Sequence, residues 1–87
     1  MSGVTPNWPL EAAAISVVVD NESWILPYAA ELVDRLKSEG HDVSLCREHG
    51  DIKPGFIAFY LGCVRITPEK VLQRNEYNLV VHESDLP

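Results

Sequence analysis

The sequence lacks the glycine patterns that hold nucleotide phosphates. Its five glycines form neither a G-x-G-x-x-G motif after the first apolar run nor a G-x-x-x-x-G-K motif. Both motifs work because glycine lets backbone amides approach a phosphate closely at the start of a helix. A dinucleotide or nucleoside triphosphate held in this way is therefore not expected.

Cysteine is scarce, and the two cysteines present do not form a C-x-x-C pair. Cys46 and Cys63 each lie in or beside an apolar run, whereas a metal site needs more ligands at closer spacing. The three histidines show no metal-ligand spacing either. We therefore expect free, buried thiols, no metal site and a cytoplasmic protein, since free thiols are typical of reducing compartments.

Basic residues and long apolar runs are also few. The chain has 7 Lys and Arg against 13 Asp and Glu, which gives a formal net charge of −6. A surface of this charge repels nucleic-acid phosphates and anionic lipids, so neither is an expected partner. No apolar run approaches the roughly 20 residues of a membrane span, and the N-terminus has no secretory-signal pattern.

Short apolar runs that alternate with helical patterns predict an α/β fold. Residues 15–19 are β-branched and almost wholly apolar, which is typical of a strand buried on both faces of a parallel sheet. Residues 25–39 carry apolar side chains at helical spacing, and Gly40 suits the left-handed end of that helix. A second strand at 43–46 makes residues 14–46 a right-handed β-α-β unit.

The second part of the chain repeats this alternation. Residues 57–61 and 78–82 are further apolar runs, and a short helix is predicted between them at 67–74, with a threonine N-cap and a proline in its first turn. We predict a Rossmann-like three-layer α/β domain fragment with a mostly parallel sheet of about four strands. Residues 1–13 are expected to be an N-terminal arm, and residues 14–87 the folded unit.

Polar residues follow three of the predicted strands. Open parallel sheets bind ligands beyond the C-terminal ends of their strands, where the strand order reverses. If the first strand lies between the second and the third, residues 20–23, 62–66 and 82–85 gather at that edge. Asp20 and Asn21 can there bind a substrate or cap the helix that follows.

His82, at the end of the last predicted strand, is the first candidate for chemistry. Its imidazole can donate to a developing oxyanion or relay a proton, or it can make a structural hydrogen bond only. Arg65 can meet an anionic group or remain solvated. His41 and His49 flank the second strand and are expected on the solvated surface. Cys63 has no histidine near it in sequence, which weakens it as a nucleophile.

Two longer runs carry a pattern that extends beyond single residues. Residues 59–68 read FYLGCVRITP, and residues 78–87 read NLVVHESDLP. In order and spacing they resemble the folate-dependent formyltransferases, whose members show an R-I-L-S-P loop, a short helix and a strand ending in N-[IV]-H-x-S-L-L-P. The resemblance implies transfer of a formyl group from 10-formyltetrahydrofolate to an amine.

The resemblance also implies roles for single residues of the second half. His82 matches the catalytic histidine, which stabilises the tetrahedral intermediate. Arg65 and Ile66 match the loop that meets the pterin of the cofactor. Ser84 and Leu86 match the start of a loop that helps to form the same pocket.

Asp20, Asn21 and Ser23 occupy the loop that, by the same resemblance, binds the substrate. In the purine enzyme of the family this loop is rich in glycine and holds a phosphate, whereas residues 20–23 are acidic and free of glycine. The resemblance therefore favours an amino sugar, linked to a nucleotide, as the small-molecule formyl acceptor.

Two departures from the family pattern affect what the chain can do. Val80 stands where the family has a catalytic asparagine, and valine cannot donate a hydrogen bond to an oxyanion. The chain also ends at Pro87, before the family's catalytic aspartate, so we expect a truncated catalytic domain that is inactive alone. The alternative is a non-catalytic half-domain whose open sheet edge pairs with a second copy or with a complementing chain. A generic flavodoxin-like domain is a further interpretation.

Overall fold

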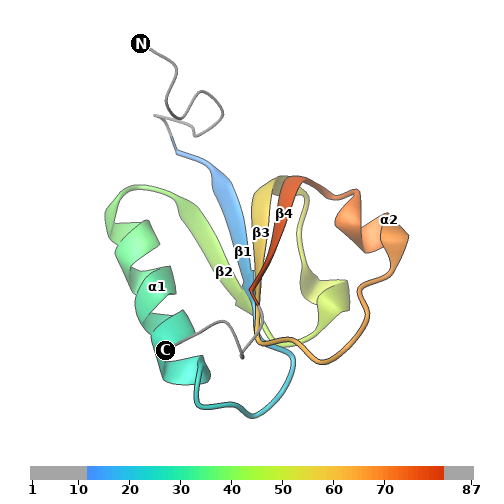
Figure 1. Ribbon diagram of the computed structural model, residues 1–87. Helices are drawn as coiled ribbons and strands as arrows, with labels where there is room; N and C mark the ends of the chain where they lie inside the picture. Colours follow the sequence, from blue (N-terminus) through green and yellow to red (C-terminus); the bar gives the residue numbers. More distant parts are fainter. Residues whose placement is uncertain (1–11, 82–87) are drawn as a thin grey trace.

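The computed structural model describes residues 12–81, which form an α/β fold, with a parallel sheet that has helices on both faces (Figure 1). The elements in chain order are β1 (Ala14–Val18), α1 (Leu26–Ser38), β2 (Asp42–Cys46), the 3-10 turn η1 (His49–Asp51), β3 (Gly55–Leu61), α2 (Glu69–Leu72) and β4 (Asn75–Val81). All strand pairs are parallel, and the strand order is β2-β1-β3-β4. The predicted fold class is thus confirmed.

The central position of β1 determines where the strand order reverses. Ser16 pairs with Ser44 of β2 on one side and with Ala58 of β3 on the other. From β1 the chain passes to β2 on one side, and it then crosses to β3 on the other side of β1. The C-terminal ends of β1 and β3 form the switch point, which is where open sheets of this kind bind ligands.

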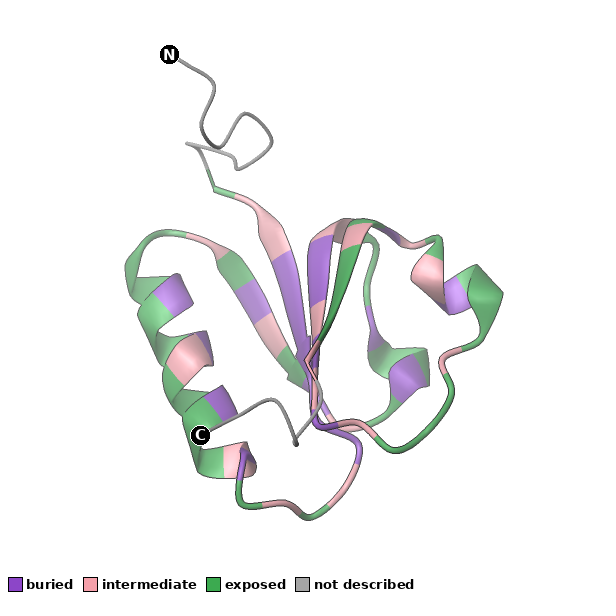
Figure 2. Cartoon of the chain, in the orientation of Figure 1, coloured by how far each residue is buried: buried purple, intermediate pink, exposed green. Residues whose placement is uncertain are grey.

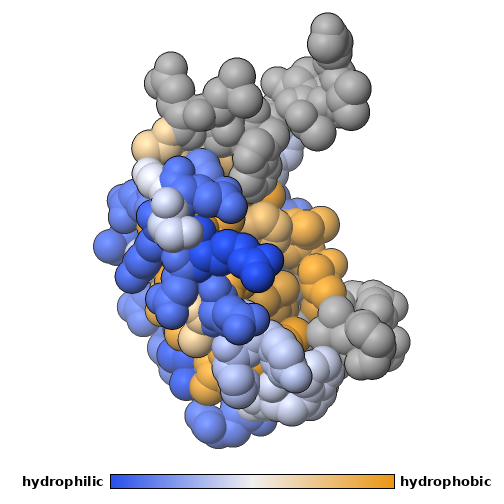
Figure 3. Space-filling view, turned by 90° about the vertical axis from the view of Figure 1, so that its left-hand side faces the viewer, coloured by the Kyte–Doolittle hydropathy of each residue, from blue (hydrophilic) through white to orange (hydrophobic). Residues whose placement is uncertain are grey.

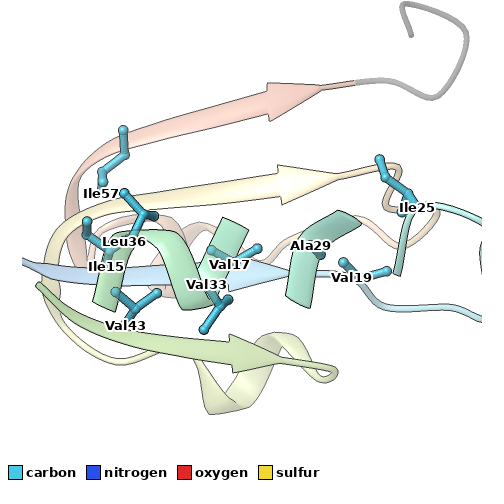
Figure 4. Packing of buried hydrophobic residues seen from close by; sticks show 9 residues of the cluster. All are labelled: Ile15, Val17, Val19, Ile25, Ala29, Val33, Leu36, Val43 and Ile57. Carbon is cyan, nitrogen blue, oxygen red and sulfur yellow. The ribbon is translucent and has the colours of Figure 1, made fainter. Parts of the chain in front are cut away.

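Successive side chains of β1 point to opposite faces of the sheet, so each face has its own core. Val17 faces α1, and Figure 4 shows its neighbours from helix and strands pointing toward one another. Val18 faces the other way, towards α2 and the segment after β2. The members of this second core are Val18, Cys46, Ile52, Ala58, Tyr60 and Val71. Buried residues accordingly run along both central strands (Figure 2).

The first helix ends as the sequence predicts. Gly40 has a φ of 95°, a value that favours glycine. Its N–H donates to the carbonyl of Lys37, and the N–H of His41 donates to the carbonyl of Leu36. These two bonds form a Schellman motif, which satisfies carbonyl groups left free at the helix end.

The second helix is shorter than predicted, and the last strand is longer. α2 covers only Glu69–Leu72, because Pro68 is extended (φ −60°, ψ 146°) and acts as its N-cap. β4 begins at Asn75 instead of residue 78, since Asn75 pairs with Gly55 and donates from its side chain to the carbonyl of Lys53. The sequence pattern missed this start because these contacts come from distant residues.

β4 is an edge strand of the described sheet and carries exposed apolar side chains. Leu79 is 49% exposed and Val80 is 53% exposed. Figure 3 views the molecule from the side on which α1 lies in Figure 1, and it shows hydrophilic side chains with apolar surface next to them. Among residues 12–81, neither α1 nor α2 is long and apolar enough to cross a membrane.

Candidate functional site

Three loops meet at the C-terminal ends of β1 and β3. They are residues 20–25 after β1, residues 47–54 after β2 and residues 62–68 after β3. The loops after β1 and β3 were predicted there, the loop after β2 was not, and the predicted residues 82–85 lie outside the described residues. The side chain of Asp20 lies between all three loops, and it is fully buried. A buried carboxylate is stable only when its oxygens accept hydrogen bonds, so its partners define the site.

Both carboxylate oxygens of Asp20 are occupied by donors from these loops. Oδ1 accepts from the side-chain amide of Asn21 at 2.8 Å and from the backbone N–H of Val64 at 3.0 Å. Oδ2 accepts from the backbone N–H of Arg65 at 2.9 Å and lies 2.8 Å from Nε2 of His49. One side chain therefore fixes the relative positions of the three loops.

The donors around Asp20 keep it ionised. Burial alone would raise the pKa of this carboxyl, but four hydrogen bonds, led by that from Asn21, outweigh burial and hold the pKa well below its ordinary value. A fixed negative charge thus lies beneath the exposed edge of the sheet. It orients the backbone of the 62–68 loop and the imidazole of His49.

His49 is buried, so the prediction that it lies on the solvated surface is wrong. Its Nε2 donates to the ionised Asp20, and its Nδ1 lies 2.8 Å from Oγ1 of Thr67. The surrounding segment is polar, which predicted a solvated loop, but Ile52 is buried in the second core and draws η1 onto the sheet. Ile52 was therefore the one feature of the sequence that could have indicated a buried His49. His41 also differs from its prediction, because it is half-buried and accepts from the N–H of Ala13 at 3.1 Å.

The fold also brings the sulfur of Cys63 within 4.8 Å of the donor atoms of Asp20 and His49, which no sequence spacing indicated. The Sγ of Cys63 donates to the carbonyl of Val18 at 3.3 Å, and the side chain is half-buried. Burial raises the pKa of the Cys63 thiol, so the thiol is protonated at neutral pH. Cys46 is a buried free thiol, as predicted.

A cavity of about 250 Å³ opens beside this group on the α2 side of the sheet. Cys63 and Thr67 border it from the loop, and Val80 borders it from β4. The complete lining is Tyr60, Cys63, Arg65, Thr67, Leu72 and Val80. The hydroxyl of Tyr60 donates to the side chain of Asn78 at 3.0 Å, so one wall of the cavity is hydrogen-bonded to the edge strand.

The 62–68 loop exposes apolar side chains although its backbone is anchored. Val64 is 73% exposed and Ile66 is 94% exposed. The N–H of Gly62 donates to the carbonyl of Val81 at 2.8 Å, and its carbonyl accepts from Asn21 at 3.0 Å. Arg65, between the two apolar residues, is exposed and pairs with Glu48 at 2.9 Å.

The structure brings several of the predicted site residues to one edge. Asp20 and Asn21 hold the neighbouring loop, and the Oγ of Ser23 accepts from the N–H of Ile25 at 3.2 Å. These contacts position the loops, and a direct role towards substrate stays a prediction for all three residues. Arg65 and Ile66 lie at the same edge, on the anchored loop.

Three predicted residues, His82, Ser84 and Leu86, lie outside the described residues. Comparison with protein-family models, with curated proteins and with solved structures gives no match to this chain. A fold of this class hosts many activities, so function has to be argued from the site.

Proposed function

We propose that this chain belongs to an N-formyltransferase-like enzyme, in which the 62–68 loop binds the pteridine ring of 10-formyltetrahydrofolate. The observation that carries the proposal is the pair of exposed apolar residues, Val64 and Ile66, on a loop whose backbone is held by Asp20. Such residues add little to folding while they face water. Covered by a flat apolar ligand, they would contribute binding energy at a loop that needs no rearrangement.

The chemistry of the loop suits a reduced folate. Ile66 offers an apolar surface for the ring system, and the remaining polar groups of the loop backbone suit its amide-like edge. Arg65 matches the same pterin-binding loop and would contribute through its backbone, because its guanidinium is paired with Glu48. Ser84 and Leu86 would complete the pocket, as the sequence resemblance implies.

The acceptor side of the reaction is proposed to lie at the start of α1. Trp24 and Tyr28 are exposed there and make an edge-to-face contact with ring centroids 5.9 Å apart. Exposed aromatic rings pack well against the apolar faces of sugars, which supports an amino sugar as the formyl acceptor. The sugar amine would form a bond to the formyl carbon while the bond from that carbon to N10 of the cofactor breaks, so that tetrahydrofolate leaves with the amine proton on N10. His82 would stabilise the negative charge that develops on the formyl oxygen.

Calorimetry with 5-formyltetrahydrofolate tests the cofactor proposal. Binding should be weakened by roughly tenfold or more in Ile66→Ser, because a covered isoleucine contributes about 1.5–3 kcal/mol. Leu79→Ser is the matched control, since Leu79 is apolar and exposed but lies on β4. Absence of heat at high micromolar ligand, or equal losses in both variants, would contradict the proposal.

A second candidate function, association through the sheet edge, is favoured by the exposed Leu79 and Val80 of β4. An unpaired edge with apolar side chains is a template for another strand. Sedimentation of the chain should then reveal a dimer that Val80→Lys dissociates, because a charge on an edge strand opposes pairing. A monomer at all concentrations would rule this function out.

A further inference from the structure

The side chains of Asp20, His49 and Cys63 meet beneath the cavity, although they come from three different loops. We propose that these three residues form a binding site for one divalent transition-metal ion of the Zn²⁺ type, with its fourth coordination position open to the cavity. This inference does not depend on the proposed formyl transfer. It replaces the expectation, drawn from sequence spacing alone, that the chain has no metal site.

The donor atoms are of the right kind and are nearly at the right distance. One carboxylate oxygen, one imidazole nitrogen and one sulfur lie within 4.8 Å of one another. Zn²⁺ is bound by these donors at about 2.0–2.3 Å in tetrahedral geometry, which places neighbouring donors roughly 3.3–3.8 Å apart. Nε2 of His49 and Oδ2 of Asp20 lie 2.8 Å apart, so they have to separate by roughly half an ångström to one ångström when a metal replaces the proton between them. Any donors that lie near the 4.8 Å limit have to approach by about one ångström.

The surroundings hold two of the three ligands in place. Protein metal ligands are normally oriented by hydrogen bonds from a second layer of residues. The N–H of Arg65 donates to Oδ2 of Asp20 at 2.9 Å, and Oγ1 of Thr67 lies 2.8 Å from Nδ1 of His49. With a metal on Nε2, the imidazole proton sits on Nδ1 and is donated to Thr67. In the metal-free structure Nε2 carries this proton, so metal binding displaces it and reverses the bond to Thr67, whose hydroxyl can either donate or accept.

Charge and access also suit a dication. Asp20 supplies one negative charge, and Cys63 supplies the second when its thiol proton is released to solvent on metal binding. The two charges neutralise the ion inside the buried part of the site. Cys63 and Thr67 border the cavity, which gives an entry path and leaves room for water or an oxygen ligand at the fourth position.

Titration with Co²⁺ tests the site directly, because cobalt reports its own ligands. We expect one equivalent to bind, with the absorption bands of tetrahedral cobalt and a thiolate-to-cobalt charge-transfer band. Cys63→Ser should abolish the charge-transfer band, and Cys46→Ser, which removes the other thiol, should leave it unchanged. His49→Gln should weaken binding strongly, whereas His41→Gln should not. Thr67→Val should weaken binding by about 10–100-fold.

Several results would overturn the inference. One is the absence of cobalt and zinc binding to the wild-type chain. Another is a charge-transfer band that survives Cys63→Ser or disappears in Cys46→Ser. A third is binding that persists unchanged in both Cys63→Ser and His49→Gln, because the metal would then lie elsewhere. Circular dichroism of each metal-free variant checks its fold. The glutamine of His49→Gln keeps a hydrogen-bond donor for Asp20, so we expect this variant to fold normally.

Discussion

Oδ2 of Asp20 lies 2.8 Å from Nε2 of His49, although 29 positions separate the two residues in the sequence. Both side chains are buried, and the bond joins the loop after β1 to the turn after β2. The same carboxylate accepts from the backbone of the loop after β3. The edge of the sheet at which a ligand would bind is therefore organised by a single ionised side chain.

Replacing Asp20 by asparagine should destabilise the fold by about 1–3 kcal/mol, because an amide leaves buried donors of the loops unsatisfied. The loss should be measured by urea unfolding at pH 7. Asp34→Asn is the matched control, since Asp34 is exposed on α1 and should change stability by less than about 0.5 kcal/mol. Equal stability of the Asp20 variant and the wild type would contradict the structural role given to this carboxylate.

The stability of the wild type should fall as the pH is lowered through the ordinary carboxyl pKa of 3.8. The pKa of Asp20 is depressed in the folded state, so the unfolded chain takes up a proton before the folded chain does. The contribution of Asp20 is thus complete above about pH 5 and is lost progressively in more acidic solution. Asp20→Asn should show a weaker dependence on pH over this range, and an identical dependence would show that other groups cause it.

Ile52 and Ile66 should respond very differently to the same substitution. Ile52 is 1% exposed and belongs to the second core, so Ile52→Ala should cost about 2–5 kcal/mol. Ile66 is 94% exposed, so Ile66→Ala should change stability by less than about 0.5 kcal/mol. Thermal unfolding of the two variants measures both values. A large loss for Ile66→Ala would mean that its side chain serves the fold and not a ligand.

A side chain at Gly55 should disrupt the pairing of the first and third strands. A Cβ there would lie 2.7 Å from the carbonyl oxygen of Ala14 and 2.8 Å from its Cβ. Because backbone atoms cannot give way cheaply, Gly55→Ala should cost about 1–3 kcal/mol. Gly50→Ala is the control, since nothing lies within 4 Å of a Cβ at that position. Chemical denaturation of both variants should separate them clearly.

The two thiols should differ in their rates of alkylation. Burial raises the pKa of both Cys46 and Cys63, so both should react more slowly with iodoacetamide at neutral pH than in the unfolded chain. Cys63 borders the cavity and should react first, whereas Cys46 is buried in the second core and should react only when the fold opens. Mass spectrometry of a time course gives the order. Earlier labelling of Cys46 would contradict the described packing.

Local sequence patterns predicted those parts of the fold that depend on local physics. The β-branched run of β1 and the glycine after α1 are such cases, because backbone preference and side-chain periodicity act within a few residues. The position of the switch point between β1 and β3 could also be predicted, since few arrangements of parallel strands are compatible with short connections. For these reasons the meeting of residues 20–23 with residues 62–66 at this edge was predicted correctly, whereas the predicted place of residues 82–85 stays a prediction.

The contacts that give this edge its chemistry depend on distant residues and could not be predicted. His49 occurs in a polar segment, and only the packing of Ile52 on the sheet carries it inside. Thr67 was expected to be the N-cap of the short helix, but Pro68 takes that position. The hydroxyl of Thr67 contacts His49 instead. The proximity of Cys63 to both buried groups likewise arises only when the loops close.

The partners of Asp20 have a consequence for how the protein folds. Its bonds to His49, Val64 and Arg65 span 29, 44 and 45 positions of the chain. The pairing of β1 with β3 spans a similar separation, 42 positions from Ser16 to Ala58, so we expect these contacts to form together with the sheet, because closing long loops costs entropy that only the assembled sheet offsets. A ligand bound at this edge therefore slows unfolding of the whole sheet and not only of one loop.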